Sequence, residues 1–265
     1  MNWPKRIVCL TEETTEFLYH IGEQDRIVGI SGFTVRPPQA RKEKPKVSAF
    51  TSAKIDKILA LKPDLVIGFS DLQADIAAEL IRQHVEVYVF NHRTVDDILR
   101  MLRTLGRLVN AEQKSEAYIQ TLEDNLNRIQ QRAKTYPVRP RVYFEEWWDP
   151  IISGIGWVSD LIHLAGGEDC FADNAAHAGG AQRIIANPQT VVDRQPDIII
   201  GSWCGRRFHP HKVGERAGWE DVPAVVNGDV HEVKSAIILQ PGPAALSDGV
   251  TALDQIIHDW VKRRA

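Results

Sequence analysis

The chain has 265 residues, of which 43% are hydrophobic and 25% charged, and its formal net charge is −3. This composition is typical of a globular protein with one large domain or two smaller ones, and it excludes disordered and fibrous classes. With 32 basic and 35 acidic residues, no overall field favours nucleic acid, so small ligands or proteins are the expected partners.

The N-terminus and the cysteines bear on the compartment. The opening MNWPKRIVCLTEET lacks the pattern of a signal peptide, and no apolar run approaches the roughly 18 residues of a transmembrane helix. We therefore expect a cytoplasmic protein without membrane insertion, or a periplasmic one if a leader is missing from this sequence. Cys9, Cys170 and Cys204 are an odd number without C-x-x-C spacing, which predicts neither a disulfide framework nor a zinc knuckle.

The first third of the chain alternates predicted strands and helices. Strands are expected in RIVCL (6–10), RIVGIS (26–31), DLVIGF (64–69) and VEVYVF (85–90). The intervening helices are a segment ending at Gly22, a segment capped by Thr51 or Ser52 and stopped before Pro63, and residues 72–84. The unbroken apolar character of the strands predicts a parallel sheet in an α/β lobe.

From Thr94 the apolar residues follow a helical period, which predicts two helices that meet near Asn110. The second, at about 111–134, has Asn110 and Gln113 placed like a cap and would be roughly 36 Å long. Strand and helix then alternate again, and the phrase KILALKPDLVIG (57–68) returns as TVVDRQPDIIIG (190–201). The echo predicts two related α/β lobes, 1–109 and 137–265, joined by a backbone helix within 110–136.

Large aromatic residues follow the predicted strands. Ligands of open α/β sheets bind outside the carboxyl ends of the strands, and clefts between lobes are preferred sites. We therefore predict an interlobe cleft floored by rings, suited to a broad, flat, partly apolar ligand. The alternative is that the rings cap the two cores or close the interface between the lobes. The rings are Phe33, Phe69, Trp147, Trp148 and Trp203.

The segment CGRRFHPH (204–211) carries further candidates. Arg206 and Arg207 are placed to bind a phosphate or an amide-rich rim, or else form a solvated basic loop. Cys204, His209 and His211 could hold a soft divalent metal, but the signal is weak and a turn with two solvated histidines is the favoured interpretation, so no metal site is assigned.

Catalytic patterns are missing from the sequence. Adjacent Glu145 and Glu146 should point to opposite faces of a strand, so they do not form an acid/base pair. No nucleophile with a credible base, no Gly-rich phosphate loop and no HExxH occurs. The sequence therefore favours a binding protein over an enzyme, and the Gly-rich segment 173–183 is predicted to be a mobile loop.

The phrases RIVCLTEETTEFLYHIGEQDRIVGIS, VSAFTSAKIDKILALKPDLVIGF, LIHLAGGEDCF and PQTVVDRQPDIIIG resemble the helical-backbone (class III) substrate-binding proteins of ABC importers, most closely the vitamin B12-binding branch. The resemblance covers nearly the whole chain. It implies two Rossmann-like α/β lobes joined by a long rigid helix, a monomer, and no required cofactor. It also implies that cobalamin or a related corrinoid binds in the aromatic interlobe cleft without chemical change. The alternatives are an iron-siderophore or haem binding protein of the same fold, or a zinc carrier.

The resemblance also assigns roles to single residues. Phe33, Phe50 and Phe69 fall where the cobalamin-binding branch places rings around the corrin, although Phe50 and Phe69 stand where tryptophan is more usual. Members that dock on a permease carry an acidic residue at the start of each Pro-Asp helix. This chain has Asp56 in the first lobe and uncharged Gln189 in the second, so an ABC permease is an expected partner with an incomplete docking pair.

Overall fold

The computed structural model describes residues 3–264, which divide into two compact units. Unit 1 comprises the residues up to His92 together with Asp96–Leu122, and unit 2 comprises Arg93–Val95 together with the residues from Glu123 onward. The division falls within α6 (Glu112–Ala133), so the helix predicted at about 111–134 is confirmed and contributes to both units. The predicted lobe boundaries at 109 and 137 stay predictions.

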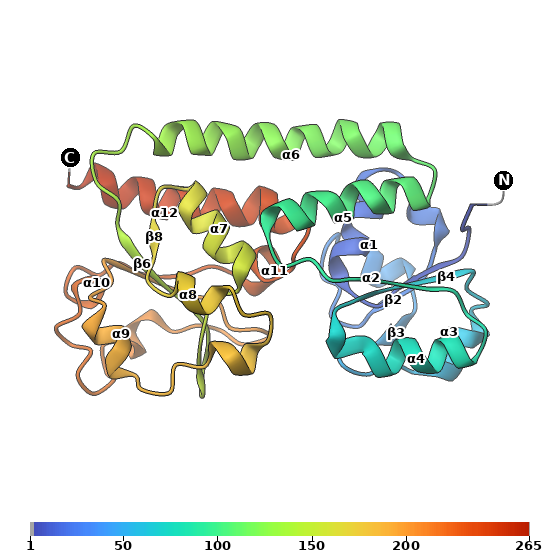
Figure 1. The fold of residues 1–265 in the computed structure, drawn as a ribbon, viewed down its shortest axis with the longest axis horizontal. Helices are drawn as coiled ribbons and strands as arrows, with labels where there is room; N and C mark the ends of the chain where they lie inside the picture. Colours follow the sequence, from blue (N-terminus) through green and yellow to red (C-terminus); the bar gives the residue numbers. More distant parts are fainter. Residues whose placement is uncertain (1–2, 265) are drawn as a thin grey trace. The chain divides into compact units, whose positions relative to one another are not determined.

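Unit 1 is built on a five-stranded parallel sheet of order β3-β2-β1-β4-β5. Figure 1 labels β2, β3 and β4 of this sheet. Its central strands are short runs of branched apolar residues, and Val8 and Val66 are fully buried, as in a sheet covered on both faces. The strands are β1 (Ile7–Cys9), β2 (Ile27–Ser31), β3 (Lys46–Ser48), β4 (Leu65–Phe69) and β5 (Val87–Phe90). The helices are α1 (Glu12–His20), η1 (Gln24–Arg26), α2 (Ala40–Glu43), α3 (Ile55–Ala60), η2 (Asp71–Gln73), α4 (Ala74–Arg82) and α5 (Val95–Leu108).

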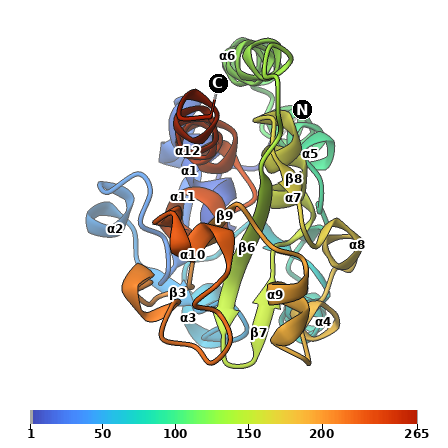
Figure 2. The same ribbon diagram turned by 90° about the vertical axis from the view of Figure 1, so that its left-hand side faces the viewer.

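Unit 2 has a second sheet of order β10-β9-β6-β7, with β8 pairing on β6. Only the β6–β7 pair is antiparallel, and these strands lie side by side as a hairpin (Figure 2). The strands are β6 (Arg141–Trp148), β7 (Ile151–Ser153), β8 (Glu168–Asp169), β9 (Ile198–Gly201) and β10 (Val230–Glu232). The helices are α7 (Gly156–Leu164), α8 (Ala172–Ala175), η3 (Gly180–Arg183), α9 (Gln189–Asp193), η4 (Pro210–Lys212), α10 (Pro223–Val226), α11 (Ser235–Ile238), η5 (Ala245–Gly249) and α12 (Val250–Lys262). The predicted α/β class is confirmed.

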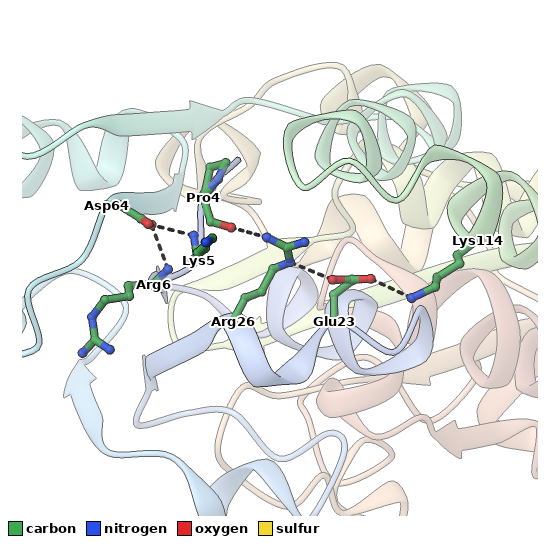
Figure 3. A network of polar contacts seen from close by, with 7 residues as sticks. All are labelled: Pro4, Lys5, Arg6, Glu23, Arg26, Asp64 and Lys114. Atoms are coloured by element: carbon green, nitrogen blue, oxygen red, sulfur yellow. Dashed lines mark hydrogen bonds and ion pairs between the residues drawn. The ribbon is translucent and has the colours of Figure 1, made fainter. Parts of the chain in front are cut away.

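The repeated Pro-Asp phrase makes the same local structure in each unit. In unit 1, the Asp64 carboxylate accepts hydrogen bonds from the backbone N–H groups of Lys5 (2.7 Å) and Arg6 (2.8 Å), just before β1 (Figure 3). In unit 2, Asp197 accepts from the backbone N–H of Arg141 at 2.8 Å, at the start of β6. The Pro-Asp motif therefore aligns the starts of two neighbouring strands in each sheet.

The residue before each of these prolines ends a helix in the left-handed region. Lys62 has φ 47° and Gln195 has φ 46°. Because proline disfavours helical backbone in the residue that precedes it, both α3 and α9 stop here. The guanidinium groups of Arg6 and Arg141 donate to carbonyl oxygens at these helix ends, to Leu61 and Arg194 respectively.

Two predicted caps are wrong. Helix α3 begins only at Ile55 with Lys54 as its N-cap, because Ala49 N–H donates to Ser52 O at 2.7 Å and folds residues 49–52 into a turn. Asn110 has φ 55° and closes α5 instead of capping α6, since the following Ala111 N–H donates to Gly106 O at 2.8 Å. Such a bond is the signature of a helix C-terminus.

The first turn of α6 is tied to unit 1 by an ion pair. Lys114 Nζ donates to Glu23 at 2.7 Å, and Glu23 also accepts from Arg26 Nε at 2.7 Å (Figure 3).

Of the helices within residues 3–264, none combines the length and the apolar character that crossing a membrane requires.

Candidate functional site

The first aromatic group lies at the carboxyl ends of the unit 1 strands. Phe33 and Phe50 follow β2 and β3 by two residues, Phe69 ends β4, and His92 follows β5. The ring centroids of Phe50 and Phe69 are 6.4 Å apart, and those of Phe69 and His92 are 4.7 Å apart. Phe33 is 55% exposed. The structure thus brings Phe50 and Phe69 together and adds His92, which the sequence reasoning missed.

Gln73 holds the backbone beneath this group. Its side chain is fully buried. The carboxamide oxygen accepts from Phe69 N–H at 2.9 Å, while Nε2 donates to Phe50 O at 2.8 Å. One side chain therefore fixes the spacing between the ends of two strands, and a lone glutamine in a helical segment gives no sequence signal of this role.

The second aromatic group is a row of three indoles in unit 2, which we call the tryptophan stack: Trp147, Trp148 and Trp203. Centroids of Trp147 and Trp148 are 4.5 Å apart with an interplanar angle of 38°, and those of Trp148 and Trp203 are 4.4 Å apart at 33°, so successive rings are tilted rather than parallel. Trp147 and Trp148 are the last residues of β6 and pair with β7, whereas they were expected just beyond the strand. Both are partly exposed.

Trp203 lies deeper than the other two indoles. It is 9% exposed and packs edge-on against Phe208, with centroids 5.1 Å apart. Gly201 makes room for Phe208, because a Cβ at this position would lie 2.0 Å from the ring. Trp203 therefore fits the interpretation that some rings cap a core, and it supports the stack from behind.

A buried carboxylate fixes Trp203. Glu145 is fully buried and accepts from Arg216 at 2.6 and 2.8 Å, from the Trp203 indole N–H at 3.1 Å and from the Tyr143 hydroxyl at 3.0 Å. Burial raises the pKa of Tyr143 well above its ordinary value, and the neighbouring Glu145 charge adds to this. Burial alone would lower the pKa of Arg216, but its hydrogen bonds and ion pair with Glu145 raise it.

Glu146 has a different arginine partner from its neighbour. Arg183, 2% exposed, donates to Glu146 at 2.6 Å. The two adjacent glutamates thus serve two separate ion pairs, with Glu145 fully buried and Glu146 partly exposed. Arg183 ends η3, so the predicted loop 173–183 contains α8 and a 3-10 helix held by this contact.

The basic segment after Trp203 lies beside the tryptophan stack. Arg206 is exposed, and its guanidinium carbon lies 5.0 Å from the Trp148 ring centroid and 5.7 Å from that of Trp147. This is within the range of a cation–π contact. Arg207 is also exposed. The structure therefore places one of the two predicted arginines, Arg206, against the aromatic rings.

The other candidate residues of the sequence are dispersed. The rings of His209 and His211 are 5.7 Å apart, and within residues 3–264 no three His, Cys, Asp or Glu side chains are grouped to hold a metal. Asp56 is exposed in the first turn of α3. Gln189 is exposed at the start of α9, where its Nε2 donates to Asp193 at 2.9 Å.

Three glutamates at the start of α1 are buried, a feature that the sequence reasoning did not single out. Glu13 is 2% exposed and accepts from Thr11 Oγ1 at 2.6 Å. Burial, together with the charge of Glu12, raises the pKa of Glu13 from 4.5 to about 8. Burial by itself would raise the pKa of Glu16 as well, but hydrogen bonds from His20 and Arg36 outweigh this effect and lower the pKa.

The fold of the chain is similar to that of solved solute-binding proteins. A possible iron-binding (periplasmic solute-binding) protein from Staphylococcus epidermidis aligns with a TM-score of 0.83 at 20% identity, over 97% of this chain and 100% of that one. The periplasmic vitamin B12 binding protein BtuF of Vibrio cholerae aligns with a TM-score of 0.78 at 22% identity, over 98% of both chains. At these identities the likeness is one of fold.

The family follows from the sequence. A family model described as periplasmic binding protein matches residues 7–237, so this chain belongs to the periplasmic binding protein family, whose members are transport components. Among its relatives is the vitamin B12-binding protein of Vibrio parahaemolyticus, 27% identical over 247 residues, which are 92% of this chain and 86% of that protein. The expected membership is confirmed.

Proposed function

We propose that this protein binds cobalamin or a related corrinoid and holds it without chemical change. The observation that carries the proposal is the tryptophan stack at the end of β6, in a chain whose relative is named a vitamin B12-binding protein. Partly exposed indoles offer a large, flat, apolar surface, which suits a broad macrocycle. Arg206 beside the rings supplies a cation for the polar rim of such a ligand.

The same proposal covers partners and chemistry. As a member of a family of transport components, the protein would deliver its ligand to an ABC permease, with Asp56 on the docking surface. This role requires a compartment outside the cytoplasmic membrane, which is the periplasmic alternative to the cytoplasmic location expected from the sequence. No catalytic step is assigned to any residue.

The experiment is a titration of the ligand-free protein with cyanocobalamin, cobinamide and haemin, followed by tryptophan fluorescence and calorimetry. We expect saturable one-to-one binding of the corrinoids and recovery of the ligand unchanged. Trp147→Ala should weaken it, whereas Trp260→Phe should not, because the Trp260 ring packs beneath Arg264 at the end of α12. Phe50→Ala tests the contribution of unit 1.

Two outcomes would overturn the proposal. No heat and no quenching at high micromolar corrinoid, with saturable binding of haemin, would favour an iron-containing ligand; the Staphylococcus epidermidis neighbour, titled as possibly iron-binding, makes this the second candidate. A chemically altered corrinoid on recovery would contradict the assignment as a binding protein.

A further inference from the structure

The hydrogen bonds around Glu145 join three parts of unit 2. Tyr143 and Glu145 belong to β6, Trp203 follows β9, and Arg216 lies in the segment after η4. These partners are 58 residues (Trp203) and 71 residues (Arg216) from Glu145 along the chain. The carboxylate is fully buried, so its position is set by these donors.

The geometry of the ion pair makes it rigid. Both terminal nitrogens of Arg216 donate to Glu145, one to each oxygen, at 2.6 and 2.8 Å. A two-point contact of this kind fixes orientation as well as distance. A buried carboxylate that loses one partner is costly to retain, so the native arrangement has few alternatives. The Arg216 guanidinium also lies 4.7 Å from the Trp219 ring centroid, which holds it from a second side.

The orientation of Trp203 is transmitted to the other two indoles. Its indole N–H is held by Glu145 at 3.1 Å, and its ring contacts Phe208 on one side and Trp148 on the other. Trp148 in turn contacts Trp147. A rotation of the Trp203 ring would therefore displace its neighbours, because rings at 4.4–4.5 Å have no free space between them.

The pairing of β6 with β7 is irregular at the same place. The register shifts between Glu145 and Trp147, so Glu146 is the extra residue. Bulges of this kind re-aim side chains. Here the extra residue and the residue before it are each held by an arginine, Glu146 by Arg183 and Glu145 by Arg216.

We propose that Glu145 is a positioning residue that, through Arg216 and the Trp203 indole, sets the planes of the tryptophan stack and thereby the ligand selectivity of this surface. The proposal rests on the proposed function for its ligand class. Glu145 itself is buried behind the rings and does not contact the ligand. Its effect is to hold the outer indoles in one arrangement before binding, which lowers the ordering cost of association.

The test compares Glu145→Gln and Trp203→Phe with Asp254→Asn as a matched control. Asp254 is also a buried carboxylate of unit 2, 2% exposed, and it pairs with an arginine, Arg132. Unlike Glu145, it is not hydrogen-bonded to a residue of the tryptophan stack. Indoles in close contact and tilted to one another couple electronically and give an exciton couplet in circular dichroism, which is measured on the ligand-free protein. Thermal stability and the dissociation constants of cobalamin and haemin are measured in parallel.

We expect Glu145→Gln and Trp203→Phe each to diminish the couplet and to weaken corrinoid binding by about tenfold, with a smaller effect on haemin. The double variant should lose less than the product of the two effects, because both act through one hydrogen bond. Asp254→Asn should lower thermal stability while leaving the couplet and the ratio of the two affinities unchanged. If Glu145→Gln does not fold, Arg216→Lys replaces it, since the charge stays and the two-point contact is lost.

A couplet and an affinity ratio that stay unchanged in Glu145→Gln, beside a loss of stability like that of Asp254→Asn, would overturn the proposal and leave Glu145 a structural residue. Failure of the proposed function looks different. In that case the wild-type protein does not bind corrinoids at all, while the couplet still reports whether Glu145 orders the indoles.

Discussion

Asp64 and Arg6 are joined by two hydrogen bonds, one in each direction. The Arg6 N–H donates to the Asp64 carboxylate at 2.8 Å, and the Asp64 N–H donates to Arg6 O at 3.0 Å. The pair links the start of β1 to the start of β4. The same carboxylate accepts from the Lys5 N–H, so we predict that Asp64→Ala, which removes both bonds, lowers the free energy of unfolding by about 1–3 kcal/mol, whereas Asp64→Asn keeps an acceptor and loses less. Urea unfolding measures both, and equal values for the two variants would contradict this role.

Gly201 should not tolerate a side chain. An alanine Cβ would lie 2.0 Å from the Phe208 ring, so the ring must move from its place against Trp203. We predict that Gly201→Ala destabilises the protein by about 1–3 kcal/mol, as overpacked cores do, and shifts tryptophan emission. Gly179→Ala is the control, because its Cβ would meet only the Gln182 carboxamide, at 3.3 Å. An unchanged unfolding midpoint in Gly201→Ala would refute the clash.

Glu13 should make stability depend on pH. Its pKa is raised from 4.5 to about 8 by burial and by Glu12, so between these values the folded protein keeps a proton that the unfolded chain has lost. This contribution is fully present below pH 4.5 and is lost as the pH rises toward 8, by up to about 1.4 kcal/mol per pH unit. The stability of Glu13→Gln minus that of the wild-type protein should therefore be larger at pH 8 than at pH 5.

The measurement for Glu13 is urea unfolding at both pH values, with Glu168→Gln as the control because Glu168 is an exposed carboxylate of β8. A difference between Glu13→Gln and wild type that is the same at both pH values would show that Glu13 does not titrate in this range.

Arg206 should distinguish ligands by charge. Cobalamin carries a phosphodiester in its nucleotide loop and cobinamide does not. Because the Arg206 guanidinium is exposed beside Trp147 and Trp148, Arg206→Ala should weaken cobalamin binding by about threefold at low salt, the scale of an exposed ion pair. Cobinamide should be affected less, and Arg206→Lys should keep part of the effect. Titrations at two ionic strengths measure this, and equal losses for both ligands would exclude an anion contact.

Local signals account for the predicted fold. The Pro63-Asp64 and Pro196-Asp197 phrases mark a helix stop followed by a buried strand, and both occur as expected, in β4 and β9. The prolines act on the residues directly before them, and the aspartates bond to backbone at a neighbouring strand. Such effects follow from single residues of the motif and can be predicted from the sequence. The cap predicted at Thr51 or Ser52 was wrong because a turn of residues 49–52 competed for the same backbone groups.

The candidate site was only partly readable. Phe69 was predicted from its position after an apolar run and Phe50 from the family resemblance, and the two rings do lie near each other. Trp147 and Trp148 were expected just beyond a strand, yet they are the last residues of β6 because they pair with β7. Strand β7 was not predicted, since it is only three residues long and a strand of this length shows no alternation. The function of the neighbouring Gln73 was missed, since its partners are chosen by the packing of other elements.

Local sequence signals were enough to predict the α/β class, the long helix α6, the two related Pro-Asp strands and the large aromatic residues at strand ends. Each of these follows from periodicity, from proline and aspartate chemistry or from composition, all of which act over a few residues. The burial of Trp203 next to Trp148 and the pairing of Glu145 with Arg216 could be seen only in the folded chain. Burial and the choice of a partner 71 residues away are set by how whole elements pack, and no local pattern carries that information.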